Sequence, residues 1–314
     1  MQEKETAENL RIIEATSLLY AQLHFLLSKN NIPHIFIKGR ALSDQGLRIE
    51  KISSDVDVFI APKNMNKIRD LFTSFGWEVR SDRSLYPPHV VAPHSLSFIH
   101  KSWPCDIDVH DQFPGMEVAG DIALQEFIKD EEFFEFAHHK VPFPSIANHA
   151  VINGLHILRE QQKSEREFLF LKDALPKLVT EEKFFDAAVK LEALGSLKPI
   201  YAAAYGLNKE VDSYTPSEDW IMLSEGKRLD IFSLVLVLNT PWKYKITVLK
   251  SMLFPDNHLL RQTALYDTNF GETKTKQEKK RFKLEALKYK IHKNLTLLTR
   301  LKDYYSYHKM LGKK

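Results

Sequence analysis

The chain has 314 residues, a net charge of +3 at pH 7, 44% hydrophobic and 27% charged residues, and one cysteine, Cys105. This length can bury one large core or two ordinary ones, and two domains are expected. The composition excludes wholesale disorder, and a single cysteine excludes an internal disulfide. The longest strongly apolar run, 231–238, is far shorter than the roughly 20 residues that span a bilayer. We therefore expect a soluble, cytoplasmic protein without membrane contact.

The charge is unevenly distributed along the chain. Residues 271–314 contain 14 Lys and Arg against 4 Asp and Glu, so this tail carries +10 and the rest of the chain carries −7. The tail could contact nucleic acid or another polyanion. It could equally be a solvated helix whose lysines keep the protein soluble.

The first part of the chain alternates predicted helices and strands. Apolar spacing predicts a long helix over 8–29, a helical turn near 41–46 and a helix over 64–75. Short β-branched or alternating runs predict strands at 34–37, 54–61 and 77–80, and a hairpin of 95–100 with 105–110. This order indicates an α+β domain.

After Gly115 the pattern becomes helical, with no further strand expected. Helices are predicted over 123–139, 145–161, 168–178, 182–194, 197–205, 219–223, 229–238, 243–254 and 277–311. The boundary is placed near Pro142, which gives an α+β domain over 1–141 and an all-α domain over 142–314 with the basic helix at its end.

Two predicted strands carry acidic residues at every second position. Side chains on a strand alternate between faces, so Asp55 and Asp57 share one face, and Asp106, Asp108 and His110 share one face of another strand. A pair of carboxylates with a third from a neighbouring strand forms the oxygen-rich site that Mg²⁺ prefers, and either Asp106 or Asp108 could be the third. Acids on the solvent face of a strand are the simpler interpretation. The other histidines, among them His149 and His156, are expected to be structural.

The turn after the first predicted strand could face a phosphate. Gly39 would allow close approach of the backbone, Lys38 would bring a mobile positive charge, and Arg48 is a second candidate phosphate ligand. A tight turn with a surface lysine is the alternative.

These segments resemble the polymerase-β-like nucleotidyltransferase superfamily, and within it a bacterial group of uncharacterised nucleotidyltransferases. The matching segments in the strand-rich part are NIPHIFIKGRAL, GLR, SSDVDVFI, SFGWEVR and IDVH. In the helical part they are FPSIANHAVINGLHIL and LFLKDALPKL, so the resemblance covers about residues 8–178. The resemblance implies a mixed sheet with flanking helices. It implies that Asp55 and Asp57 are the metal pair, Asp108 is the third carboxylate, and Lys38 with Gly39 faces the nucleotide phosphates. The superfamily's common Gly-Ser pair is Lys-Gly here.

The expected activity is transfer of a nucleoside monophosphate from a nucleoside triphosphate to a hydroxyl acceptor, with Mg²⁺ or Mn²⁺ as cofactor and release of pyrophosphate. Asp55, Asp57 and Asp108 are the expected catalytic and metal-binding residues. Lys38, Gly39, Arg48 and His110 are the expected nucleotide-binding residues. The acceptor could be a small molecule, a protein or an RNA. The alternatives are a glycosyltransferase with an Asp-x-Asp site, and a non-catalytic nucleotide- or nucleic-acid-binding module with a decayed metal site.

Overall fold

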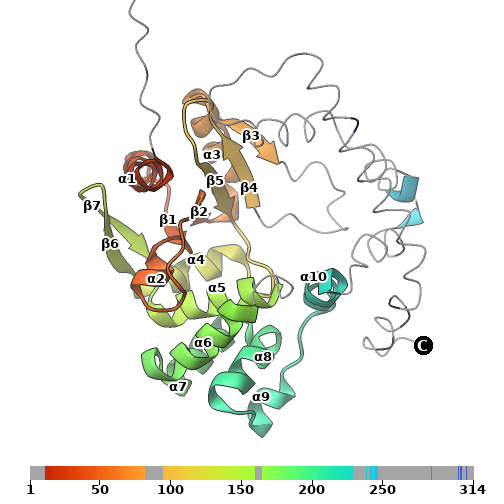
Figure 1. Ribbon diagram of the computed structural model, residues 1–314. Helices are drawn as coiled ribbons and strands as arrows, with labels where there is room; N and C mark the ends of the chain where they lie inside the picture. Colours follow the sequence, from red (N-terminus) through yellow and green to blue (C-terminus); the bar gives the residue numbers. More distant parts are fainter. Residues whose placement is uncertain are drawn as a thin grey trace, which may run out of the picture.

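The structure is a computed structural model, and it describes residues 11–81, 95–159 and 165–228, with a few single positions beyond them. These residues form a strand-rich part and a helical part (Figure 1). The predicted helices over 229–238, 243–254 and 277–311, and with them the basic tail, lie outside the described ranges. Within those ranges, no helix is long and apolar enough to cross a membrane.

A five-stranded mixed sheet lies at the centre of the strand-rich part. Its strands are β1 (His34–Ile37), β2 (Asp55–Ile60), β3 (Glu78–Ser81), β4 (Ser95–Ile99) and β5 (Asp106–His110), in the spatial order β1-β2-β5-β4-β3. Strands β2 and β5 are parallel, and all the other neighbours are antiparallel. The expected strands, including the β4–β5 hairpin, are confirmed.

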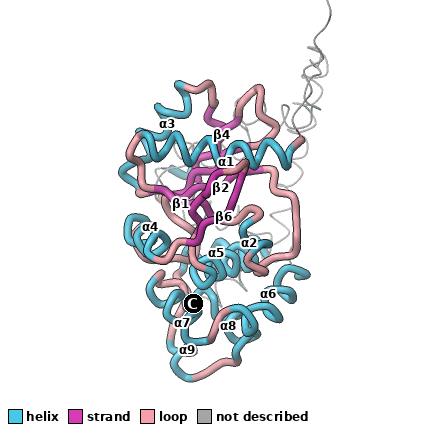
Figure 2. The backbone as a smooth tube through the Cα atoms, turned by 90° about the vertical axis from the view of Figure 1, so that its left-hand side faces the viewer, coloured by secondary structure: helices cyan, strands magenta, loops and turns pink. Residues whose placement is uncertain are grey.

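One face of this sheet packs against two helices. Helix α1 (Ile12–Lys29) crosses the strands on this side (Figure 2), and α3 (Met65–Ser74) follows β2 after the short helix η1 (Pro62–Asn64). The buried residues of this face come from alternate strand positions, which is why these strands show period-two alternation. They include Val56, Val58, Ile60, Ile107 and Val109, all fully buried.

The other face packs against the second group of helices. Its apolar positions, among them Ile35, Ile37 and Phe59, belong to one cluster with α2 (Ala41–Asp44), α4 (Gly120–Lys129) and α5 (Ile146–Arg159). The same cluster extends into the helices that follow. These are α6 (Glu165–Leu178), α7 (Glu181–Lys190), α8 (Leu194–Tyr205), α9 (Lys209–Ser213) and α10 (Glu218–Arg228). The acidic positions of β2 and β5 lie on this face, so the site lies between sheet and helices.

The prediction of one helix over 123–139 was wrong. Helix α4 ends at Lys129, and a second, two-stranded sheet follows, formed by β6 (Glu132–Phe136) and β7 (His139–Phe143). The two strands join at Ala137 and His138, which have positive φ of 45° and 63°. Phe136 and Phe143 pack beside Tyr20 of α1, so the hairpin closes the core on the α1 side.

The predicted fold class, a mixed α+β sheet with flanking helices followed by a helical region, is confirmed. The division at 141/142 falls within β7 and stays a prediction.

Candidate cation and phosphate site

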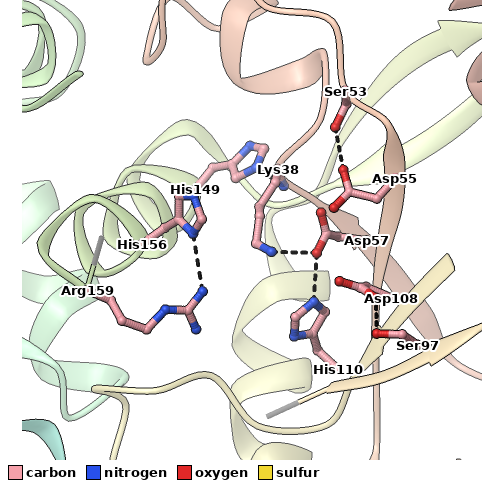
Figure 3. Close-up of polar contacts among 10 residues, drawn as sticks. All are labelled: Lys38, Ser53, Asp55, Asp57, Ser97, Asp108, His110, His149, His156 and Arg159. Carbon is pink, nitrogen blue, oxygen red and sulfur yellow. Dashed lines mark hydrogen bonds and ion pairs between the residues drawn. The ribbon is translucent and has the colours of Figure 1, made fainter. Parts of the chain in front are cut away.

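Strand register brings two of the predicted carboxylates together. Asp57 of β2 lies directly opposite Asp108 of the parallel strand β5, and Asp55 lies opposite Asp106. Ligand atoms of Asp57, Asp108 and His110 lie within 4.8 Å of one another, which is close enough to hold one metal ion. Among the described residues, it is the group of His, Cys, Asp and Glu side chains whose ligand atoms lie close enough together for one ion. Figure 3 shows the three side chains converging from β2 and β5.

Asp57 is the centre of this cluster. Its Oδ1 lies 2.5 Å from Nζ of Lys38 and 2.7 Å from Nε2 of His110. Burial would raise the pKa of the Asp57 carboxyl, but the charge of Lys38 and the hydrogen bond from His110 outweigh it and hold the pKa below its usual range. Asp57 is therefore an ionised carboxylate, and the Lys38 ammonium and the hydrogen bond from His110 stabilise its buried charge.

Asp55 and Asp108 each accept a hydrogen bond from a serine. Ser53 Oγ donates to Asp55 at 2.7 Å, and Ser97 Oγ on β4 donates to Asp108 at 2.5 Å. Burial, together with the negative charges of Asp57 and Asp108, raises the pKa of Asp55 to about 6. Asp55 lies on the same strand face as Asp57 but outside the three-residue cluster. In the cluster Asp57 is joined by Asp108 and His110, and the role of Asp55 as a metal ligand stays a prediction.

The turn at Lys38 and Gly39 is held by a buried histidine. Both residues have positive φ, 61° and 57°, a conformation that costs a lysine about 1–2 kcal/mol. The backbone N–H of Lys38 donates to Nε2 of His149 at 2.7 Å, and Nδ1 of His149 donates to Oε1 of Gln45 at 2.6 Å. These bonds need a neutral imidazole, and burial lowers its pKa to about 3. His149 is structural, as expected, and it places Lys38 at Asp57.

Arg48 contacts the backbone of the Lys38–Gly39 turn. Nη2 of Arg48 donates to the carbonyl oxygen of Gly39 at 2.7 Å, and the arginine is buried. Arg48 thus stabilises the Lys38–Gly39 turn through this hydrogen bond. A direct contact of Arg48 with phosphate stays a prediction.

Sequence reasoning missed the residues on the wall opposite the carboxylates. His156 and Arg159 of α5 face Lys38 and His110 across the site (Figure 3). Nη2 of Arg159 lies 3.5 Å from Nδ1 of His156, and the Arg159 guanidinium and the Lys38 ammonium lie 5.9 and 5.8 Å from the centre of the same Phe113 ring. Burial and the two cations lower the pKa of His156 to about 3. Two buried cationic side chains thus approach one ring.

The donor groups fit a divalent cation. Carboxylates such as Asp57 and Asp108 are ligands that Mg²⁺ and Mn²⁺ prefer, and an imidazole suits a transition metal. The Lys38 ammonium compensates the charge of the buried Asp57, so a metal ion bound here would share that carboxylate with Lys38 or displace it. His110 could ligate the ion or hold Asp57 in position by its hydrogen bond.

Fold and site together define a mixed-sheet protein with a candidate divalent-cation site on two parallel strands. No family model matches the chain, and no curated protein matches it. A solved structure that is similar to it is the solution structure of the antibiotic-resistance factor ANT(2'')-Ia, an aminoglycoside nucleotidyltransferase. The two share 12% identity and a TM-score of 0.33 over 60% of this chain and 90% of that one. A likeness at this level does not define a family.

Proposed function

We propose that this protein transfers a nucleoside monophosphate from a nucleoside triphosphate to a hydroxyl acceptor and releases pyrophosphate. The observation that carries the proposal is the convergence of Asp57, Asp108 and His110 from adjacent parallel strands, with the Lys38 ammonium 2.5 Å from Asp57. Two carboxylates beside mobile and fixed cations suit a metal-bound polyphosphate.

Asp57 and Asp108 would hold the metal ion, with Asp55 next to them on β2. The ion, Mg²⁺ or Mn²⁺, would supply positive charge to the phosphate oxygens as the transfer proceeds. Lys38 carries three N–H donors on a flexible stem, so its ammonium can turn from Asp57 to a phosphate oxygen when the ion takes over the charge of Asp57. The short Lys38 to Asp57 contact is then the form of the site before substrate binds.

Lys38, His156 and Arg159 would hold the leaving pyrophosphate. His156 and Arg159 lie on the wall opposite the carboxylates, whereas Lys38 lies beside Asp57, and the Phe113 ring lies near both cations. A guanidinium binds phosphate with two parallel hydrogen bonds, and a neutral imidazole can donate a further one. The charge that accumulates on pyrophosphate as it leaves is stabilised by groups that are already in position.

The reaction forms one bond and breaks one. The acceptor hydroxyl oxygen attacks the α-phosphorus, and the bond from that phosphorus to the oxygen bridging to the β-phosphate breaks. The hydroxyl proton passes to a carboxylate of the site, for which Asp108 is the predicted acceptor. Pyrophosphate takes the electron pair of the broken bond.

The test is nucleotide binding and transfer by the full chain. Calorimetry with ATP, GTP, CTP and UTP, each with and without MgCl₂, should show metal-dependent affinity for at least one nucleotide. With that nucleotide labelled at its α-phosphate, an extract should yield a labelled product in the presence of wild type and none with Asp57→Asn or Asp108→Asn. A binding module without catalysis would give metal-independent affinity, or affinity without label transfer, and either result contradicts the proposal.

A further inference from the structure

A cavity of about 750 Å³ opens beside the Lys38 and Gly39 turn, on the α1 side. Its volume lies in the range of small-molecule sites, roughly 300–1,000 Å³. The walls come from α1, α2, the loop before β2 and the end of the β6–β7 hairpin. The lining residues that matter here are Leu18, Tyr20, Glu50, Ile52 and Ser53.

The cavity has an apolar rim. Ile13, Leu18 and Ile52 line it and are exposed, with relative accessibilities of 56%, 43% and 60%. Single exposed aliphatic side chains are ordinary on a protein surface, whereas three around one cavity form a local apolar surface that the described residues leave exposed. A ligand with an apolar face would cover them.

The charges of the cavity disfavour a polyphosphate. Three acidic residues line it, Glu14, Asp44 and Glu50, against two basic ones, Arg40 and Lys51. Both basic residues are already in ion pairs: Arg40 lies 3.2 Å from Asp44, and Lys51 lies 3.4 Å from Glu167. Glu50 is exposed, and the described part of the chain offers it no ion pair. A neutral or amine-bearing ligand suits this lining better than an anion does.

Two lining residues connect the cavity to the carboxylates. Ser53 lines it and donates its hydroxyl hydrogen to Asp55. Tyr20 also lines it, and its buried hydroxyl abuts Gly39.

The proposed reaction requires the acceptor on this side. In an in-line displacement the attacking and leaving oxygens lie on opposite sides of the phosphorus. His156 and Arg159, which suit the leaving pyrophosphate, lie on α5 (Figure 3). The attacking hydroxyl must then approach from the other end of the carboxylate row, where Ser53, which donates to Asp55, lines the cavity.

Resting on the proposed function, we infer that this cavity binds the acceptor, and that the acceptor is a small hydroxylated amine with an apolar face. The apolar part lies against Leu18 and Ile52, the amine faces Glu50, and the hydroxyl points past Ser53 along the carboxylate row towards Asp108.

Phenylalaninol is a suitable probe, because it combines a hydroxyl, an amine and an apolar ring. Its binding to the full chain can be measured by ligand-observed NMR, with 3-phenyl-1-propanol as the partner without the amine. Leu18→Trp, which fills the cavity, should weaken phenylalaninol binding at least tenfold and leave Mg²⁺-dependent nucleotide affinity within twofold. Phe25→Trp is the matched control, since Phe25 is exposed on α1 and does not line the cavity. It should change neither affinity.

Glu50→Gln is the second variant and changes no volume. It should weaken phenylalaninol severalfold and leave 3-phenyl-1-propanol unchanged. The inference is overturned if phenylalaninol does not bind to wild type, if Leu18→Trp leaves its binding intact, or if Leu18→Trp lowers nucleotide affinity tenfold, since the cavity would then hold the nucleotide. Failure of the proposed function gives a different result: wild type would show no metal-dependent nucleotide affinity, whatever the probes do.

Discussion

The ammonium group of Lys38 lies 2.5 Å from Oδ1 of Asp57, and both side chains are almost inaccessible to solvent, with 11% and 2% exposed. Breaking a buried ion pair by removing one partner costs about 3–5 kcal/mol, because the other charge stays buried without compensation. Asp57→Asn should therefore lower the free energy of unfolding by about that amount. Urea denaturation measures the effect.

The double variant Lys38→Met/Asp57→Asn is the control for this prediction. Replacing both charged partners removes the uncompensated lysine, so most of the lost stability should return. Equal stability of the single and double variants would show that Lys38 is not the group left without compensation.

Asp106 and Asp108 form a matched pair for the cation site. They lie on the same strand, but Asp108 belongs to the cluster with Asp57 and His110, whereas Asp106 is opposite Asp55. Asp108→Asn should weaken Mn²⁺ binding at least tenfold, and Asp106→Asn should weaken it by less than threefold. Calorimetric titration with MnCl₂ distinguishes them, and equal losses in the two variants would place the cation elsewhere on the strand.

Gly39 should tolerate no side chain. A Cβ at this position would lie 2.1 Å from the Tyr20 hydroxyl oxygen, and φ is +57°. Gly39→Ala combines the clash with a backbone cost of about 1–2 kcal/mol, so we expect a loss of about 3 kcal/mol or more.

The Tyr20→Phe substitution separates the two causes of this loss, the clash with the Tyr20 hydroxyl and the backbone cost of a positive φ. Without the hydroxyl oxygen, the nearest atom is the ring carbon at 3.2 Å, a tight contact that a small shift relieves. Gly39→Ala in the Tyr20→Phe background should cost only the backbone part, about 1–2 kcal/mol. The same loss in both backgrounds would contradict a clash with Tyr20.

Much of the fold could be predicted from the sequence because the central strands have one apolar face and one polar face. In β2 and β5 apolar and acidic residues alternate, so the same pattern predicts the strand, its buried face and the row of carboxylates. His110 could be assigned to the site for the same reason, since it belongs to β5, and Lys38 was assigned from its Lys-Gly turn after β1. Both side chains contact Asp57, and their role as nucleotide ligands stays a prediction.

The rest could not be predicted, for identifiable reasons. The segment Glu132–Phe136, EFFEF, places phenylalanines at spacings that also suit a helix, and its turn at Ala137 and His138 contains neither Gly nor Asn despite positive φ. The partner of Arg48 is a backbone carbonyl, which no side-chain pattern reveals. His156 and Arg159 reach the site only through packing of α5 against the sheet. Their spacing of three on one helix face was the available signal.

Acid should destabilise the protein through its buried histidines. Burial lowers the pKa of His34 to about 4, and the pKa values of His149 and His156 to about 3, from 6.5. Below pH 6.5 the unfolded chain binds protons that the folded chain does not. Stability is therefore complete above pH 6.5 and is lost as pH falls towards 4, by up to about 1.4 kcal/mol per pH unit for each histidine.

His34→Gln tests this pH dependence away from the candidate site. Between pH 6 and pH 5 the unfolding free energy of the variant should fall less steeply than that of wild type. The two slopes should differ by about 1 kcal/mol per pH unit. Above pH 7 the two curves should run parallel. Curves that stay parallel down to pH 5 would show that His34 does not titrate on unfolding.

The alternation of β5 would also couple correct folding to the proposed cation binding. If β5 slipped by one residue against β2, its faces would exchange, so that Asp106, Asp108 and His110 would enter the apolar layer beneath α1 and α3 while Ile107 and Val109 would face the helices of the second layer. A chain in that register would lose core and cation site together. Bound Mn²⁺ would therefore report the fraction of molecules whose sheet has formed in the native register, which makes a spectroscopic Mn²⁺ signal a probe of refolding as well as of function.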